Sequence, residues 1–169
     1  MRYWLQTIRL WFIVSRPLLY PLVPLIALFG YRHAGGTLLT VTTADLLLLL
    51  CLTLPFSLVV YGLNDIYDYV SDIQNKHRHW LTGGAALPDT HRRIWLGVLL
   101  SMCVVLLAAL YQGSSLTFLM CGVALGAAFL YSVPPLRLKS VPFADMLFSG
   151  AAYVLVPFLI GTSMRGQLF

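Results

Sequence analysis

The stretch NDIYDYVSD, residues 64–72, follows a long apolar run and carries three of the chain's six acidic residues. On an α-helix each residue advances about 100°, so the oxygen-bearing side chains of Asn64, Asp65, Asp68 and Asp72 fall within roughly a quarter turn. Carboxylates at positions i and i+4 repel one another and destabilise an isolated helix. A bound divalent cation would offset that repulsion, so the stretch predicts a cation site at the end of a helix.

The rest of the chain has the composition of a membrane protein, with 59% apolar and only 10% charged residues. The apolar residues form five runs that approach the ~20 residues needed to cross a bilayer. We therefore predict an all-α, multi-span transmembrane helix bundle with about five spans, forming a single membrane domain over residues 1–169. Pro21 and Pro24 predict a kink in the first run, and Pro55 a bend in the second. The runs cover residues 10–31, 45–63, 94–111, 116–131 and 143–162.

The basic residues divide unequally between the two predicted membrane faces. Because helices alternate in direction, the N-terminus and the segments after runs two and four share one face. Nine of the eleven Lys and Arg residues lie on that face, which predicts that it is cytoplasmic, in a plasma or inner membrane. The net charge of +5 is thus explained by topology and not by nucleic-acid binding. The nine are Arg2, Arg9, Arg16, Lys76, Arg78, Arg92, Arg93, Arg137 and Lys139.

A basic loop lies on the same predicted face as the acidic stretch. Pro134 and Pro135 predict an extended loop, from which Arg137 and Lys139, together with Arg16, could reach an anionic group. Positive-inside anchoring alone also explains these charges. Four tyrosines lie near the same face as well, and they form either an interfacial belt or, in part, the wall of a substrate pocket. They are Tyr61, Tyr67, Tyr69 and Tyr131.

Acidic and basic groups on one membrane face suit chemistry on a phosphorylated lipid. Mg²⁺ prefers oxygen ligands and is usually held by one or two carboxylates together with substrate phosphates. The acidic stretch therefore resembles half of a Mg²⁺–phosphate site rather than a closed cage. Mg²⁺ and the basic residues would hold a diphosphate and stabilise it as a leaving group, while the membrane bundle keeps water from the allylic cation left behind.

The motifs resemble those of the UbiA superfamily of intramembrane prenyltransferases. Asn64-Asp65-x-x-Asp68-x-x-x-Asp72 is similar to the first Asp-rich motif of that family, and Tyr131-Ser132-x-Pro134-Pro135 is similar to its Tyr-Ser-x-Pro-Pro signature. Ser15-Arg16-Pro17 and Asn75-Lys76 also match family motifs, in the right order along the chain. The segments around these motifs resemble carotenoid-type members, the lycopene elongases.

The resemblance implies an enzyme that binds an isoprenyl diphosphate through Mg²⁺ and transfers the prenyl group to a lipophilic acceptor, such as an aromatic compound, a quinone precursor or a carotenoid. It implies that Asn64, Asp68 and Asp72 organise Mg²⁺, with Asp65 in support and with Asp68 and Asp72 as the catalytic pair. Contacts to diphosphate are implied for Arg16, Lys76, Arg137 and Lys139, and Tyr61 and Tyr131 are the pocket candidates.

This sequence differs from the family in one respect. Family members have nearly twice as many helices and a second Asp-rich motif, whereas no DxxxD or DxxD pattern follows residue 72 here. We therefore expect the chain to correspond to the N-terminal part of a longer bundle. The alternative is a non-catalytic membrane scaffold or a cation-binding transport fragment, which would show no Mg²⁺-dependent affinity for isoprenyl diphosphates.

Overall fold

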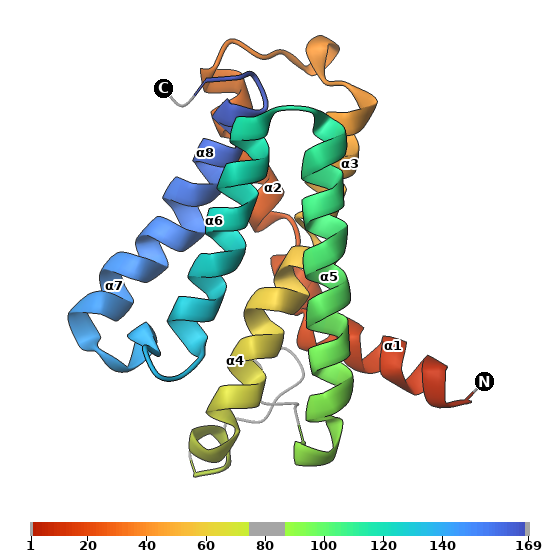
Figure 1. The fold of residues 1–169 in the computed structure, drawn as a ribbon, viewed down its shortest axis with the longest axis vertical. Coiled ribbons are helices and arrows are strands. Elements are labelled where there is room, and N and C mark those ends of the chain that lie inside the picture. Colours follow the sequence, from red (N-terminus) through yellow and green to blue (C-terminus); the bar gives the residue numbers. More distant parts are fainter. Residues whose placement is uncertain (1, 75–86, 168–169) are drawn as a thin grey trace.

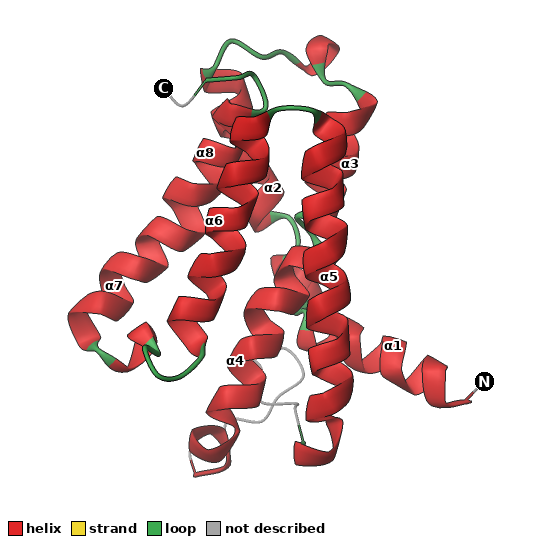
Figure 2. Ribbon diagram, viewed as in Figure 1, coloured by secondary structure: helices red, strands yellow, loops and turns green. Residues whose placement is uncertain are grey.

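The computed structural model describes residues 2–74 and 87–167, and every regular element in this part of the chain is helical. Where the connections lie within the described residues, short loops and single 3₁₀ turns join the helices, and a π-helical segment, Ala151–Leu155, connects the last two helices (Figure 2). The predicted all-α class is confirmed. The helices are α1 (Arg2–Val14), α2 (Leu22–His33), α3 (Thr43–Cys51), α4 (Leu54–Gln74), α5 (His91–Gln112), α6 (Ser115–Ser132), α7 (Pro142–Gly150) and α8 (Val156–Ser163).

Four segments of the described chain are long and apolar enough to cross a membrane, namely Thr43–Asp72, Pro88–Gln112, Ser115–Ser132 and Pro142–Ser163. The pair formed by α1 and α2, bent by 50°, gives a fifth span if it crosses as one unit. This agrees with the predicted number of about five. Near Pro55, where a bend is predicted, the helix is interrupted, because α3 ends at Cys51 and α4 begins at Leu54. Pro55 sits in the first turn of α4, where its missing N–H costs no helical hydrogen bond.

The bundle has two distinct ends. One end gathers the last turns of α4, the start of α5 and the turn between α6 and α7, whereas the C-terminus and the α5–α6 turn lie at the other end (Figure 1). The predicted meeting of the acidic stretch with the Pro-Pro segment at one end is therefore confirmed. The cytoplasmic orientation of that end and of the N-terminus remains a prediction.

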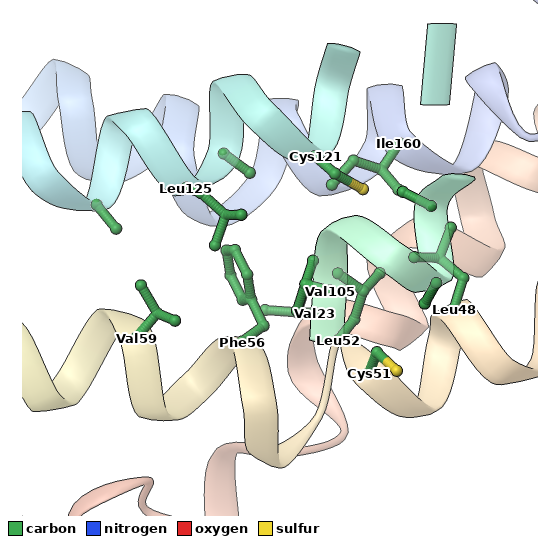
Figure 3. Packing of buried hydrophobic residues seen from close by; sticks show 14 of the residues in the cluster. Val23, Leu48, Cys51, Leu52, Phe56, Val59, Val105, Cys121, Leu125 and Ile160 are labelled. Atoms are coloured by element: carbon green, nitrogen blue, oxygen red, sulfur yellow. The ribbon is translucent and has the colours of Figure 1, made fainter. Parts of the chain in front are cut away.

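One core joins the helices at the middle of the bundle (Figure 3). Leu52 and Val59 are fully buried on either side of Phe56, and these α3–α4 residues face apolar side chains of the other spans. Close packing of this kind leaves α4 little freedom to rotate, so the orientation of its polar last turns is set by the apolar turns before them. The partners shown are Val23 of α2, Val105 of α5, Cys121 and Leu125 of α6, and Ile160 of α8.

Helices α2 and α8 pack closely through two glycines. A Cβ atom added to Gly30 would lie 2.0 Å from the backbone oxygen of Phe158, and one added to Gly161 would lie 1.8 Å from the backbone oxygen of Ala27. Membrane helices lack a hydrophobic driving force between them and depend on such small residues to bring backbones into contact. This contact holds the span Pro142–Ser163, which carries one wall of the pocket described below, against α2.

Candidate functional site

Asp68 of α4 is the centre of a charged cluster. One carboxylate oxygen of Asp68 accepts a hydrogen bond from the Arg137 guanidinium at 2.8 Å, and the other accepts one from the Lys139 ammonium at 2.7 Å. Lys139 also donates to the side-chain oxygen of Asn64 at 2.5 Å. Asn64 and Asp68 lie one turn apart on α4, so one cation bridges two oxygens of the predicted metal-binding face. We call these four residues the charged cluster.

The shape of the segment after α6 explains why both basic residues reach α4. The prediction of an extended loop is wrong, because the chain turns back on itself after Val133 and the Arg137 amide donates to the Val133 carbonyl at 3.1 Å. Arg137 has a left-handed backbone (φ 35°), and a 3₁₀ turn over Leu138–Ser140 follows it. In an extended loop, residues 137 and 139 would point in the same direction without curling toward α4. Here the turn brings both onto a single carboxylate.

Two further contacts fix the charged cluster to the helices. Ser132, at the end of α6, donates to the Asn64 side chain at 3.3 Å, and the Arg137 guanidinium also contacts the Tyr67 carbonyl at 3.3 Å.

The Lys139 side chain is only 10% exposed. Burial lowers the pKa of Lys139, and the neighbouring carboxylates of Asp68 and Asp72 oppose that shift.

Asp65 and Arg16 form an ion pair with each other. The Arg16 guanidinium lies 3.0 Å from the Asp65 carboxylate, which is 2% exposed, and stacks 4.3 Å above the centre of the Tyr61 ring. Arg16 has a left-handed backbone (φ 54°) at the break between α1 and α2. This pair therefore ties the break in the first span to α4, next to the charged cluster. In this structure the contacts of Arg16 are to protein, so any contact with a diphosphate stays a prediction.

We expect Arg16→Ala to lower the free energy of unfolding by about 3 kcal/mol, because it removes the cation beside a buried carboxylate. Thermal unfolding of the protein in detergent checks this, with Arg9→Ala as the control, since Arg9 is an exposed arginine of α1. The double variant Arg16→Met, Asp65→Leu should recover much of the loss because it removes both charges. Equal unfolding temperatures for Arg16→Ala and Arg9→Ala would contradict this structural role.

Two further predicted site residues are Asp72 and Lys76. Asp72 lies one turn beyond Asp68 on α4 and is half-buried, and its charge acts on Lys139. Lys76 falls outside the described residues. Among the described residues, no group of three or more His, Cys, Asp or Glu side chains is placed to hold a metal ion. The metal assignment thus stays a prediction.

An apolar pocket lies along α4, α6 and the segment after α7. It is partly open and includes Tyr131 in its wall. A smaller neighbouring hollow includes Tyr61, and the two share Phe56, Val60 and Tyr153. Both tyrosines named as pocket candidates therefore lie in pocket walls. The other lining residues of the larger pocket are Ala124, Ala127, Ala128, Ser149 and Ala152.

Sequence reasoning missed some of the polar groups at this pocket. Tyr153 forms a hydrogen bond with Tyr61, and the Tyr131 hydroxyl donates to Asp145 of α7 at 2.7 Å. Nothing in the sequence marks Tyr153 as a site residue except that its side chain carries a hydroxyl group within a long apolar run. Asp145 carries a stronger one, since it is the single charged residue of the span Pro142–Ser163. Such a residue in a membrane span generally faces the bundle interior.

A helical bundle with several apolar spans and a charged cluster at one end defines an integral membrane protein. The chain belongs to the UbiA prenyltransferase family, whose model matches residues 18–168. That match covers the charged cluster, Asp65, the pocket and the α2–α8 contact. No solved structure matches the chain.

Curated relatives come from carotenoid biosynthesis. The chain is 30% identical over 113 residues to a lycopene elongase/hydratase of Corynebacterium glutamicum, a match that covers 67% of this chain and 39% of the relative. It is 28% identical over 112 residues to the C(50) beta-cyclic carotenoids biosynthesis protein LbtBC of Dietzia sp. strain CQ4, covering 66% of this chain and 26% of that relative. The match therefore spans well under half of either relative.

Proposed function

We propose that the protein takes part in Mg²⁺-dependent transfer of a prenyl group from an isoprenyl diphosphate to a lipophilic acceptor within the membrane. The observation that carries this proposal is the charged cluster, in which oxygens of α4 and cations from the turn after α6 meet beside an apolar pocket. Membership of a prenyltransferase family supports the reaction type. The carotenoid relatives favour a polyene as the acceptor.

The residues present fit a magnesium ion. The Lys139 ammonium already bridges oxygens of Asn64 and Asp68, so these oxygens are placed to share one cation. Asp72 would add a carboxylate one turn further along, and phosphate oxygens of the substrate would complete the shell, as is usual for Mg²⁺. Asp65 would support the site through its ion pair with Arg16. Once bound, the ion would neutralise the charge that develops on the departing diphosphate.

Arg137 and Lys139 are suited to hold the diphosphate itself. The Nε atom of Arg137 is buried and has no hydrogen-bond partner among the described residues. A buried donor without a partner costs about 1–3 kcal/mol, which a ligand oxygen would recover. The planar guanidinium can bind two phosphate oxygens, and Lys139 supplies a point charge beside it. On this proposal, the carboxylate of Asp68 takes the place of the diphosphate as their partner when no substrate is bound.

The apolar pocket would hold the hydrocarbon part of the substrate. Its lining is aliphatic and aromatic except for three hydroxyl groups, those of Tyr131, Ser149 and Tyr153. An allylic cation formed at the diphosphate end would therefore face few groups able to quench it, while aromatic faces stabilise positive charge. Exclusion of water is the contribution that a membrane bundle makes to this chemistry.

A transfer assay tests the proposal directly. Membranes containing the protein, supplied with a radiolabelled isoprenyl diphosphate and a carotenoid acceptor, should form a prenylated lipid when Mg²⁺ is present. Chelation with EDTA should reduce product formation by at least about 100-fold because the leaving group loses its counter-ion, and added Mg²⁺ should restore it. Binding of the diphosphate without any transfer, or transfer that persists in EDTA, would contradict the proposal.

A further inference from the structure

Asp145 is a carboxylate that the proposed reaction has not yet used. It lies in the first turn of α7, and the Pro142–Ser163 span contains no other charged residue. The hydroxyl of Tyr131 donates a hydrogen bond to Asp145 Oδ1 at 2.7 Å, and Ser149 Oγ donates to the same oxygen at 3.2 Å. A carboxylate in an apolar span that is held by two hydroxyl groups is a candidate for proton transfer.

The position of Tyr131 connects this carboxylate with the pocket. Tyr131 and Ser149 both line the apolar pocket, whereas Asp145 is not part of the lining and accepts a hydrogen bond from the Tyr131 hydroxyl. The Tyr131 side chain thus connects the pocket with Asp145, and the proton of its hydroxyl is directed at the carboxylate. A proton released in the pocket can therefore reach the ionisable Asp145 through a single intermediate group, the Tyr131 hydroxyl.

We propose that Tyr131 and Asp145 form a proton relay that ends the prenyl-transfer reaction, an inference that rests on the proposed function. When the electron pair of an acceptor alkene forms the new C–C bond, the positive charge moves to the adjacent acceptor carbon. A neighbouring C–H bond then breaks, and its electron pair forms a new C=C bond. The proton passes to the Tyr131 oxygen as the proton of Tyr131 passes to Asp145 Oδ1, and the neutral Asp145 later returns its proton to water.

A purely structural role for the same contacts predicts something different. A carboxylate in the first turn of α7 is favoured by the helix dipole, and its hydrogen bond with Tyr131 also fastens α6 to α7. Asparagine at position 145 keeps the acceptor oxygen for Tyr131 but cannot take up a proton at neutral pH. Alanine removes the hydrogen bond altogether. Comparison of Asp145→Asn with Asp145→Ala therefore separates a relay from a tether.

The experiment measures transfer of labelled prenyl groups in membranes, and also calorimetric binding of inorganic diphosphate with Mg²⁺ to each purified variant. We expect Asp145→Asn and Tyr131→Phe each to lower transfer by about 100-fold, the lower end of what an acid–base group contributes, while diphosphate binding stays within about twofold of the wild type. Asp89→Asn, at an exposed position just before α5, is the matched control and should leave transfer unchanged.

The outcomes separate this inference from the proposed function. Transfer by Asp145→Asn at the wild-type level, with loss only in Asp145→Ala, would show a tether and overturn the relay. Full activity of Tyr131→Phe would overturn it too. Loss of diphosphate binding in Asp145→Asn would show that the residue acts on the site as a whole. Absence of transfer by the wild-type protein counts against the proposed function itself, whatever the variants do.

Discussion

Alanine in place of Asp68 is expected to abolish Mg²⁺-dependent prenyl transfer, by more than about 100-fold, because the charged cluster loses its central carboxylate. The change removes one predicted metal ligand and the partner of both Arg137 and Lys139. Asp72→Ala should also abolish transfer, if the second carboxylate of the acidic stretch completes the metal site. Product formation from a labelled isoprenyl diphosphate in membranes measures both effects.

Asp89→Ala provides the matched control, since it removes an exposed carboxylate that lies just before α5, outside the charged cluster. It should keep transfer near the wild-type rate. Full activity of both Asp68→Ala and Asp72→Ala would show that the metal assignment is wrong. Loss of activity in all three variants would point to the net charge of this end of the bundle, and not to particular ligands.

The second large effect is expected on stability. Gly161→Ala should lower the free energy of unfolding by about 3 kcal/mol, the upper part of the usual range for overpacking. The added methyl group would lie 1.8 Å from the backbone oxygen of Ala27, and a backbone atom cannot rotate away as a flexible side chain can. Helices α2 and α8 would have to separate. A fall in the unfolding temperature in detergent, measured by circular dichroism, checks this.

Gly126→Ala is the control for Gly161→Ala. Gly126 lies in α6, and a Cβ atom built there has nothing within 4 Å. The same substitution should therefore be neutral or slightly stabilising at this position, since alanine favours the helix. Equal unfolding temperatures for the two variants would show that α2 and α8 do not pack as closely as the structure places them.

The charged end of the fold could be predicted because its signals are local or topological. The position of Asn64 and Asp68 on one helical face follows from their spacing, and Lys139 does bridge them. The alternation of spans then brings the segment after α6 to the same end as the last turns of α4 (Figure 1). Composition alone was enough for the helical class, since a lipid environment excludes most other ways of satisfying the backbone.

Contacts that depend on packing were not visible in the sequence. The Pro-Pro segment was predicted to be extended because each proline restricts the residue before it. The hydrogen bond from the Arg137 amide to the Val133 carbonyl instead closes a turn over this segment. Arg16 was predicted to bind an anionic group of the substrate, yet in the structure its guanidinium lies 3.0 Å from the carboxylate of Asp65. Spacing places Asp65 on the same helical face as the other residues of the acidic stretch, but it does not predict which basic residue pairs with Asp65. Tyr153 was missed for the same reason, since its contact with Tyr61 joins distant parts of the chain.

The central claim is that the charged cluster binds a diphosphate together with Mg²⁺. Calorimetric titration of the purified protein with a non-hydrolysable isoprenyl diphosphate analogue, with and without Mg²⁺, tests it most directly. We predict binding that depends on Mg²⁺, that is lost in Asp68→Ala and that is retained in Asp89→Ala. Binding of equal affinity without Mg²⁺, or undiminished binding by Asp68→Ala, would contradict the claim and would favour a membrane protein that keeps the motif without the chemistry.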